Sequence, residues 1–206
     1  MIPILMADDE TLIRSALATM LGLEDDLEVI AHVGTGEELL EVWRQRVDAG
    51  EPTAVAVLDL QMPGIDGVET AMKVLELSPG AGVLIVTSHG RPGYLKRALA
   101  GGVRGFLPKT ASSNTLASVI RTVHGGGRYV DPELAAEAIS TGDSALTARE
   151  ADVLEFALDG ASVDEIAARA HLSPGTTRNY LSAAMSKLGV ANRYEAAVKA
   201  RELGWI

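Results

Sequence analysis

The chain of 206 residues contains no cysteine, and aromatic residues make up only 4% of it. The absence of cysteine excludes disulfides, thiolate metal sites and cysteine nucleophiles. No apolar stretch approaches the roughly 18 to 20 residues that a membrane-spanning helix needs. The first residues also lack the basic segment of a signal peptide. We therefore expect a cytoplasmic protein with no membrane insertion.

Positive charge is also scarce, because the formal net charge is −10. The deficit is uneven along the chain. Residues 173–206 hold five lysines and arginines against two acidic residues, a local balance of +3. Since a nucleic-acid contact depends on local charge, this segment can still meet phosphates. Composition alone leaves an ordinary solvated helical face equally open.

Two apolar runs, each followed by acidic residues, are the most informative pattern. Residues 54–59 end on Asp59 just before a Pro-Gly pair, and residues 2–7 lead directly into Asp8 and Asp9. Such runs are typical of strands buried on both faces. The carboxyl ends of parallel strands form the functional edge of an open α/β sheet. Three carboxylates there repel one another unless a cation lies between them, which indicates a divalent ion and phosphate chemistry on Asp59.

The rest of the chain divides into two patterns. Up to about residue 124, five strand patterns alternate with five helical patterns, which predicts an α/β doubly wound sheet. We place a linker at residues 125–143, with a short helix over 132–139. From residue 144 to 206 the strand pattern is absent, and four short helices are expected. Their start signals are a Thr147 to Glu150 capping box and the pair Ser173-Pro174.

Residues 1–122 resemble a response-regulator receiver domain, which has a flavodoxin-like (βα)5 fold. The resemblance rests on four features in order at strand ends. They are Asp8-Asp9, the segment from Asp59 to Gly64, Thr87, and Gly105-Phe-Leu-Pro-Lys109. Together they are far more specific than any one of them.

The resemblance assigns a role to each of these residues. It implies that Asp59 becomes a 4-aspartylphosphate, with Lys109 and Thr87 contacting the phosphoryl oxygens. Thr87 and Phe106 would form the switch, with Phe106 turning inward behind Thr87. A Mg²⁺ ion would be held by Asp9, Asp59, the backbone carbonyl of Gln61 and, through water, Asp8. Family members often have a cis peptide after the lysine, and the sequence leaves the isomer of Lys109–Thr110 open.

Residues 146–206 resemble the LuxR-type helix-turn-helix domain of the NarL/FixJ family. The match extends over the whole segment. The residues that carry it are Leu146-Thr-Ala-Arg-Glu150, Val153-Leu154, Gly160, Glu165-Ile-Ala167, Leu172-Ser173, Thr176, Lys187-Leu-Gly-Val190, Asn192-Arg193 and Ala196-Ala-Val198.

The helix expected over residues 174–188 is the candidate for the DNA major groove. On its outer face we expect side chains that read base edges: Thr177, Arg178, Asn179 and Ser182. Arg178 suits guanine and Asn179 suits adenine. Phosphate contacts, which position the protein without specifying sequence, are expected from Ser173, Thr176, Lys187 and Arg193. For any single one, an exposed polar residue without a DNA contact is equally open.

The combined resemblance implies a two-component transcription factor, not a dedicated enzyme. A sensor histidine kinase would phosphorylate Asp59, and the phosphorylated protein would form a homodimer on double-stranded promoter DNA. The family subgroup suggests self-association through the first and fifth receiver helices, and the last helix is another candidate. The residues are Ile13, Leu17, Leu116 and Ile120 in the receiver and Tyr194, Val198 and Leu203 at the C-terminal end, and some of them must also serve the core.

Three other classes fit less well. An aspartyl phosphohydrolase generally has a second aspartate two residues after the nucleophile, where this chain has Gln61. A ligand-sensing LuxR-type regulator would need an aromatic pocket. A DNA binder that ignores phosphorylation would leave the acidic cluster without a purpose.

Overall fold

The computed structural model describes residues 1–51, 55–88, 92–140, 144–203 and 205–206. The chain folds into two compact units, one formed mainly by residues up to 134 and the other mainly by residues from 135 onward. Each unit is described by itself. Within the described residues, no helix is both long and apolar enough to cross a bilayer.

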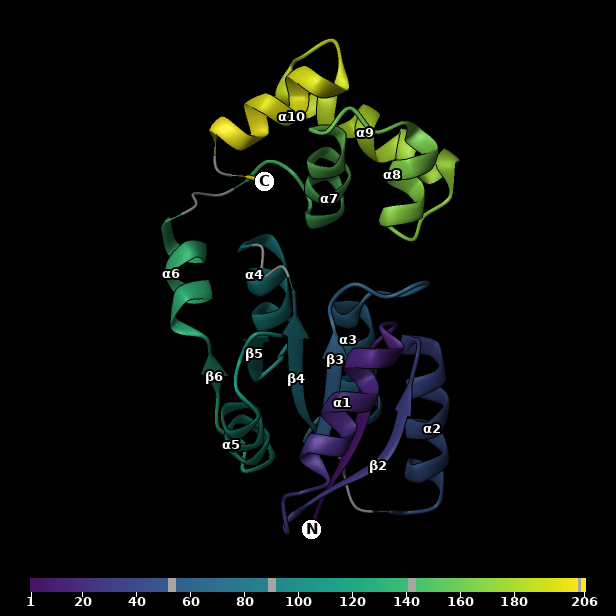
Figure 1. Ribbon diagram of the computed structural model, residues 1–206, viewed down its shortest axis with the longest axis vertical. Coiled ribbons are helices and arrows are strands. Elements are labelled where there is room, and N and C mark those ends of the chain that lie inside the picture. The colour runs from purple at the N-terminus through teal and green to yellow at the C-terminus, as the bar shows by residue number, and fades with distance from the viewer. Residues whose placement is uncertain (52–54, 89–91, 141–143, 204) are drawn as a thin grey trace. The chain divides into compact units, whose positions relative to one another are not determined.

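A parallel sheet forms the centre of the N-terminal unit (Figure 1). Its strands lie in the order β2-β1-β3-β4-β5-β6. This confirms the doubly wound α/β fold class. Their bounds are β1 Ile2–Ala7, β2 Leu27–Val33, β3 Val55–Asp59, β4 Gly82–Thr87, β5 Gly105–Pro108 and β6 Tyr129–Val130. Residue 54, expected at the start of the third strand, lies outside the described residues.

The helices of this unit pack on both faces of the sheet. They are α1 Thr11–Leu21, α2 Gly36–Asp48, α3 Gly67–Leu77, α4 Pro92–Ala100 and α5 Ser113–His124. Successive strand residues point to opposite faces. One face, with Met6, Val57 and Leu84, forms a buried core with α1 and α5. On the other face α2 and α3 pack against each other and against β1 and β3.

The helix α5 contributes its apolar stripe to this core. Leu116 is 3% exposed and Ile120 is fully buried. These two side chains therefore serve the core, whereas Ile13 and Leu17 on α1 are half-buried, and the self-association surface on α1 and α5 stays a prediction.

The sixth strand was not predicted. Gly105 and Phe106 of β5 pair with Tyr129 and Val130 of β6, and the N–H of Asp131 donates to the Phe106 carbonyl at 3.0 Å. Two residues are too few to give a strand periodicity. The expected linker therefore begins as an edge strand of the sheet and continues as α6, Pro132–Ser140, while residues 141–143 lie outside the described part.

After α6, the described part of the C-terminal unit continues with four short helices. They are α7 Ala148–Ala157, α8 Val163–Arg169, α9 Pro174–Leu188 and α10 Arg193–Glu202. The expected start signals are confirmed, since Thr147 and Glu150 form a reciprocal capping box and Ser173 caps α9 with proline in its first turn. At the other end of α9, Gly189 has φ +65°, a left-handed conformation that favours glycine.

The glycine at the start of α3 tests how tightly the helix is held against β3. A Cβ atom on Gly67 would overlap the carbonyl oxygen of Asp59, which is backbone. We expect Gly67→Ala to lower the free energy of unfolding of the N-terminal unit by about 2–3 kcal/mol, because overpacking against backbone forces a shift. Urea denaturation measures this.

Gly80→Ala is the matched control, since a Cβ there meets nothing within 4 Å. Equal stability of the two variants would show that α3 moves away from β3 at little cost.

Candidate functional site

Three of the predicted carboxylates lie together at the carboxyl edge of the sheet. Asp8 and Asp9 follow β1, and Asp59 ends β3, which is the neighbouring strand. Each offers an oxygen, and these oxygens lie within 4.8 Å of one another. Asp8 is 2% exposed and Asp59 is 7% exposed. Because β1 and β3 are adjacent and parallel, the acidic residues at their carboxyl ends form one nearly buried site.

Lys109 supplies a cation to this cluster. Its Nζ atom lies 2.9 Å from Asp8 Oδ2 and 3.4 Å from Asp59 Oδ1. It also donates to Glu10 Oε1 at 2.8 Å. Sequence reasoning predicted Lys109 here but missed Glu10. The two are 99 positions apart in the chain, so no local pattern could have paired them.

The Asp59 carboxylate is held in an environment that disfavours its charge. Burial raises the pKa of Asp59 to about 7, and the negative charge of Asp8 adds to this effect against the opposing attraction of Lys109. One hydrogen bond orients the group, because the N–H of Leu60 donates to Asp59 Oδ1 at 2.8 Å. Asp59 Oδ1 is thus held between the Leu60 N–H and the Lys109 ammonium group.

The donor set fits a hard divalent ion. All three grouped ligands are carboxylates, and no thiol exists in the chain. Magnesium prefers oxygen ligands and is bound through a few carboxylates. The backbone carbonyl of Gln61 stays a predicted ligand.

The predicted switch residues lie on β4 and β5, the next two strands of the sheet after β3. Thr87 ends β4 and is 2% exposed, and Phe106 on β5 is fully buried. The N–H of Lys109 donates to the Thr87 carbonyl at 2.7 Å, so the switch threonine and the lysine share a backbone contact. Phe106 is thus buried in this structure, and its role in a switch stays a prediction. The Lys109–Thr110 peptide is trans, as are all peptides of the described segments.

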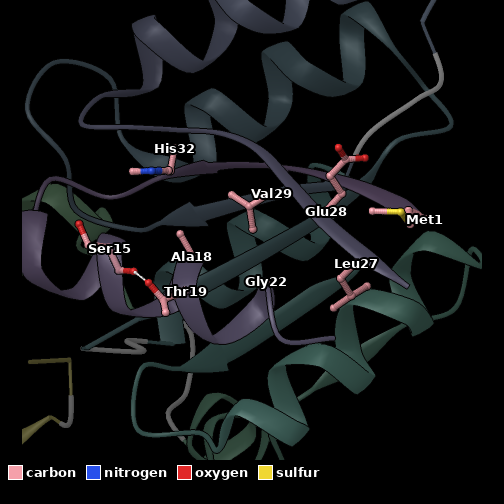
Figure 2. A pocket seen from close by; sticks show the side chains of 9 residues that line it. All are labelled: Met1, Ser15, Ala18, Thr19, Gly22, Leu27, Glu28, Val29 and His32. Atoms are coloured by element: carbon pink, nitrogen blue, oxygen red, sulfur yellow. Dashed lines mark hydrogen bonds between the residues drawn. The ribbon is translucent and has the colours of Figure 1, made fainter. Parts of the chain in front are cut away.

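A hollow of about 510 Å³ lies elsewhere, between α1 and β2 (Figure 2). Figure 2 shows Ser15 and Thr19 on the helix side and Val29 and His32 on the strand side. The Thr19 hydroxyl already donates to the Ser15 carbonyl at 2.8 Å. The lining is about half polar, with Glu28 and His32 among its residues, and it includes none of the residues of the acidic site.

In the C-terminal unit, α9 presents three of the four predicted base-reading side chains to solvent. Arg178, Asn179 and Ser182 are exposed. Thr177 is completely buried, and its hydroxyl donates to the Ser173 carbonyl at 3.1 Å. The prediction that Thr177 reads a base edge is therefore wrong. Its position is four residues before buried Leu181, which places it on the core face of the helix.

The side chains predicted to contact phosphates differ in their exposure and in the partners they already have within the unit. Ser173 caps α9, and its hydroxyl lies 2.8 Å from that of Thr176. Arg193 is half-buried at the start of α10. Lys187 is exposed, but its Nζ lies 2.7 Å from Glu150 Oε2. A phosphate contact by Lys187 would therefore compete with an ion pair inside the unit.

Comparison with known proteins agrees with this geometry. The family model "Response regulator receiver domain" matches residues 4–121, and "Bacterial regulatory proteins, luxR family" matches residues 144–200. The chain belongs to the response regulators that join a receiver domain to a LuxR-type DNA-binding domain.

Individual relatives match along the full length. The chain is 39% identical to the transcriptional regulatory protein DesR of Bacillus subtilis, over 100% of this chain and 99% of DesR. It is 37% identical to the transcriptional regulatory protein UhpA of Escherichia coli, over 100% of both. Among solved structures, the response regulator ChrA of a heme-sensing two-component system gives a TM-score of 0.55 at 31% identity, covering 100% of this chain and 98% of ChrA.

The contact between Glu150 and Lys187 makes a prediction about stability. Burial raises the pKa of Glu150, but hydrogen bonds from Lys187 and Thr147 outweigh it and hold that pKa below its usual value of 4.5. We expect Lys187→Met to destabilise the C-terminal unit by about 1–2 kcal/mol at pH 7, because it leaves a buried carboxylate without its cation, an effect limited by partial exposure of the lysine. Thermal denaturation followed by circular dichroism measures it.

The sign of the pH dependence follows from the lowered pKa. The stabilisation is present above pH 4.5 and is lost as the pH falls through the folded-state value, so wild type and Lys187→Met should converge below pH 4.5. Lys73→Met removes an exposed pair with Glu69 and should change little. A difference between wild type and Lys187→Met that persists undiminished in acid would argue against the ion pair.

Proposed function

We propose that this protein is a transcription regulator controlled by phosphorylation of Asp59 by a sensor histidine kinase. The observation that carries the proposal is the site at the sheet edge, where Asp59 lies beside Asp8, Asp9 and Lys109. The names of the relatives DesR and UhpA, both transcriptional regulatory proteins, support the same role. A regulator of this kind works where DNA lies, in the cytoplasm.

The chemical step is an in-line phosphoryl transfer. A carboxylate oxygen of Asp59 attacks the phosphorus of a phosphohistidine, the P–N bond breaks, and the electron pair leaves with the imidazole nitrogen, giving a 4-aspartylphosphate. Hydrolysis later returns the carboxylate and releases inorganic phosphate. The protein thus supports its own phosphorylation and dephosphorylation without being a dedicated enzyme.

Electrostatics account for the roles of the surrounding residues. Two or more negative charges cannot collect in a nearly buried pocket without cations. Mg²⁺, held by Asp9, Asp59 and the Gln61 carbonyl with Asp8 acting through water, would supply charge neutralisation at the phosphoryl oxygens. Lys109, which follows β5 at the same edge of the sheet, supplies a second cation as a flexible point charge suited to a phosphoryl oxygen.

Thr87 and Phe106 connect the site to the rest of the receiver. The Thr87 hydroxyl bonds a phosphoryl oxygen, and the buried Phe106 ring is kept in its inward position behind it. Because Phe106 belongs to a strand that pairs with both β4 and β6, a local charge change reaches two neighbouring strands.

DNA binding is assigned to α9. Its exposed residues Arg178, Asn179 and Ser182 read base edges, while Ser173, Thr176, Lys187 and Arg193 meet phosphates. The segment 173–206 has a balance of only +3, so one copy binds DNA weakly. Phosphorylation therefore acts through a homodimer, in which two linked modules bind two half-sites. The exposed side chains of Tyr194 and Leu203 on and after α10 are available for self-association.

Phosphorylation of Asp59 is tested with acetyl phosphate and Mg²⁺. We expect intact-mass spectrometry to show one addition of about 80 Da, the mass of one phosphoryl group. Asp59→Ala should show no addition, and removal of Mg²⁺ with a chelator should reduce it to background. Labelling that persists in Asp59→Ala would place the phosphoryl group elsewhere.

The same preparation reports the assembly state. Beryllofluoride, a phosphoryl mimic, should shift wild type from monomer to dimer in size-exclusion chromatography with light scattering, and should leave Asp59→Ala unchanged. If wild type stays monomeric with and without beryllofluoride, phosphorylation does not act through dimerisation.

Sequence discrimination is tested at Arg178. A DNA site is first selected from a random-sequence pool with phosphorylated wild-type protein. Arg178→Ala should lower affinity for that site by about 1–3 kcal/mol while leaving affinity for random DNA nearly unchanged, because a bidentate contact to guanine is lost. Fluorescence anisotropy measures both.

Arg201→Ala, which removes the same charge from α10, serves as the control and should retain the discrimination. An equal loss on selected and random DNA in Arg178→Ala would instead place Arg178 on phosphate.

A further inference from the structure

We propose that Glu10 is a positioning residue that competes with the phosphoryl group for Lys109 and so restrains phosphorylation of Asp59. This inference rests on the proposed phosphorylation. It concerns a side chain next to the predicted acidic pair but outside the predicted set of ligands and switch residues.

The contacts of Lys109 carry the argument. Its Nζ makes two short contacts, to Glu10 at 2.8 Å and to Asp8 at 2.9 Å, and a longer one of 3.4 Å to Asp59. The lysine side chain is only 7% exposed. An ammonium group has three protons to donate, and the short contacts direct two of them to Glu10 and Asp8, so Nζ can approach a phosphoryl oxygen on Asp59 closely only by moving away from one of these carboxylates.

Glu10 is the partner that can be exchanged. Its side chain is 52% exposed, whereas that of Asp8 is 3% exposed. On losing Lys109, Glu10 can be solvated by water, but the Asp8 carboxylate would be left as a nearly buried charge. When a phosphoryl group arrives, Lys109 therefore turns from Glu10 and keeps Asp8.

The position of Glu10 in the chain supports a role other than helix capping. Glu10 is the N-cap residue of α1, yet its side chain makes no capping hydrogen bond. Serine, threonine, asparagine or aspartate is preferred at an N-cap. Such residues cap α2, α3, α5, α7, α8, α9 and α10 with a side-chain oxygen. At α1 the carboxylate is directed to Lys109 instead.

Two physical effects then act in the same direction. The Glu10 carboxylate occupies the cation that the phosphoryl group needs, and its negative charge repels an anionic phosphodonor. Removing the carboxylate should speed phosphorylation and, because Lys109 is free to hold the product, lengthen its lifetime. A residue with only a structural role would slow the reaction when mutated.

The test compares Glu10→Gln with wild type, using acetyl phosphate and Mg²⁺. We expect the phosphorylation rate to rise about three- to tenfold, the effect of one unit charge a few ångströms away at intermediate dielectric. We also expect the acyl-phosphate half-life to lengthen. Intact-mass spectrometry over time measures both.

Two further variants keep the test decisive. Glu10→Ser removes the same carboxylate and introduces a preferred N-cap, so it should react faster while melting at a higher temperature, and it serves if Glu10→Gln folds poorly. Glu41→Gln removes an exposed carboxylate from α2 and should react at the wild-type rate.

Rates for Glu10→Gln and Glu10→Ser equal to or below that of wild type would overturn the inference, as would an equal acceleration in Glu41→Gln. Failure of the proposed function looks different, because wild type itself would then gain no phosphoryl group.

Discussion

The chemistry of the receiver unit depends on an excess of negative charge at one edge of its sheet. Asp8, Asp9 and Asp59 present three carboxylates within a few ångströms, and Lys109 is the cation placed among them. Burial removes most of the water that would otherwise screen these charges. The raised pKa of Asp59 expresses the same imbalance. A cation between these carboxylates would relieve their mutual repulsion.

Backbone packing holds that imbalance in place. Asp59 ends a strand that is buried along its whole length, and Gly67 brings the start of α3 against the Asp59 carbonyl. The N–H of Gly67 donates to the Leu60 carbonyl at 2.9 Å. The loop between β3 and α3 is thus closed by backbone contacts immediately after Asp59. Among the side chains that Lys109 contacts at this edge, Glu10 is the most exposed, at 52%.

The sequence was sufficient to predict the parts of this arrangement that follow from strand ends. Asp8, Asp9, Asp59, Thr87 and Lys109 each end or follow an apolar run, and parallel strands bring such positions to one edge. Pairings between distant side chains have no such signal, which is why Glu10 was missed. The strand β6 was missed for another reason, since its two residues are held by backbone hydrogen bonds to β5 and not by a pattern of their own.

The helix α9 was predicted correctly, but one of its residues, Thr177, was assigned to the wrong face. Buried positions Thr177, Leu181, Ala184 and Leu188 follow spacings of four, three and four, which is the apolar stripe of a helix. A hydroxyl in that stripe looks polar by type and was assigned to the outer face. In the structure it donates to the carbonyl four residues earlier, and this backbone bond lets threonine occupy a core position. Residue position on the helix, more than polarity, therefore decides which side chains of α9 can reach DNA.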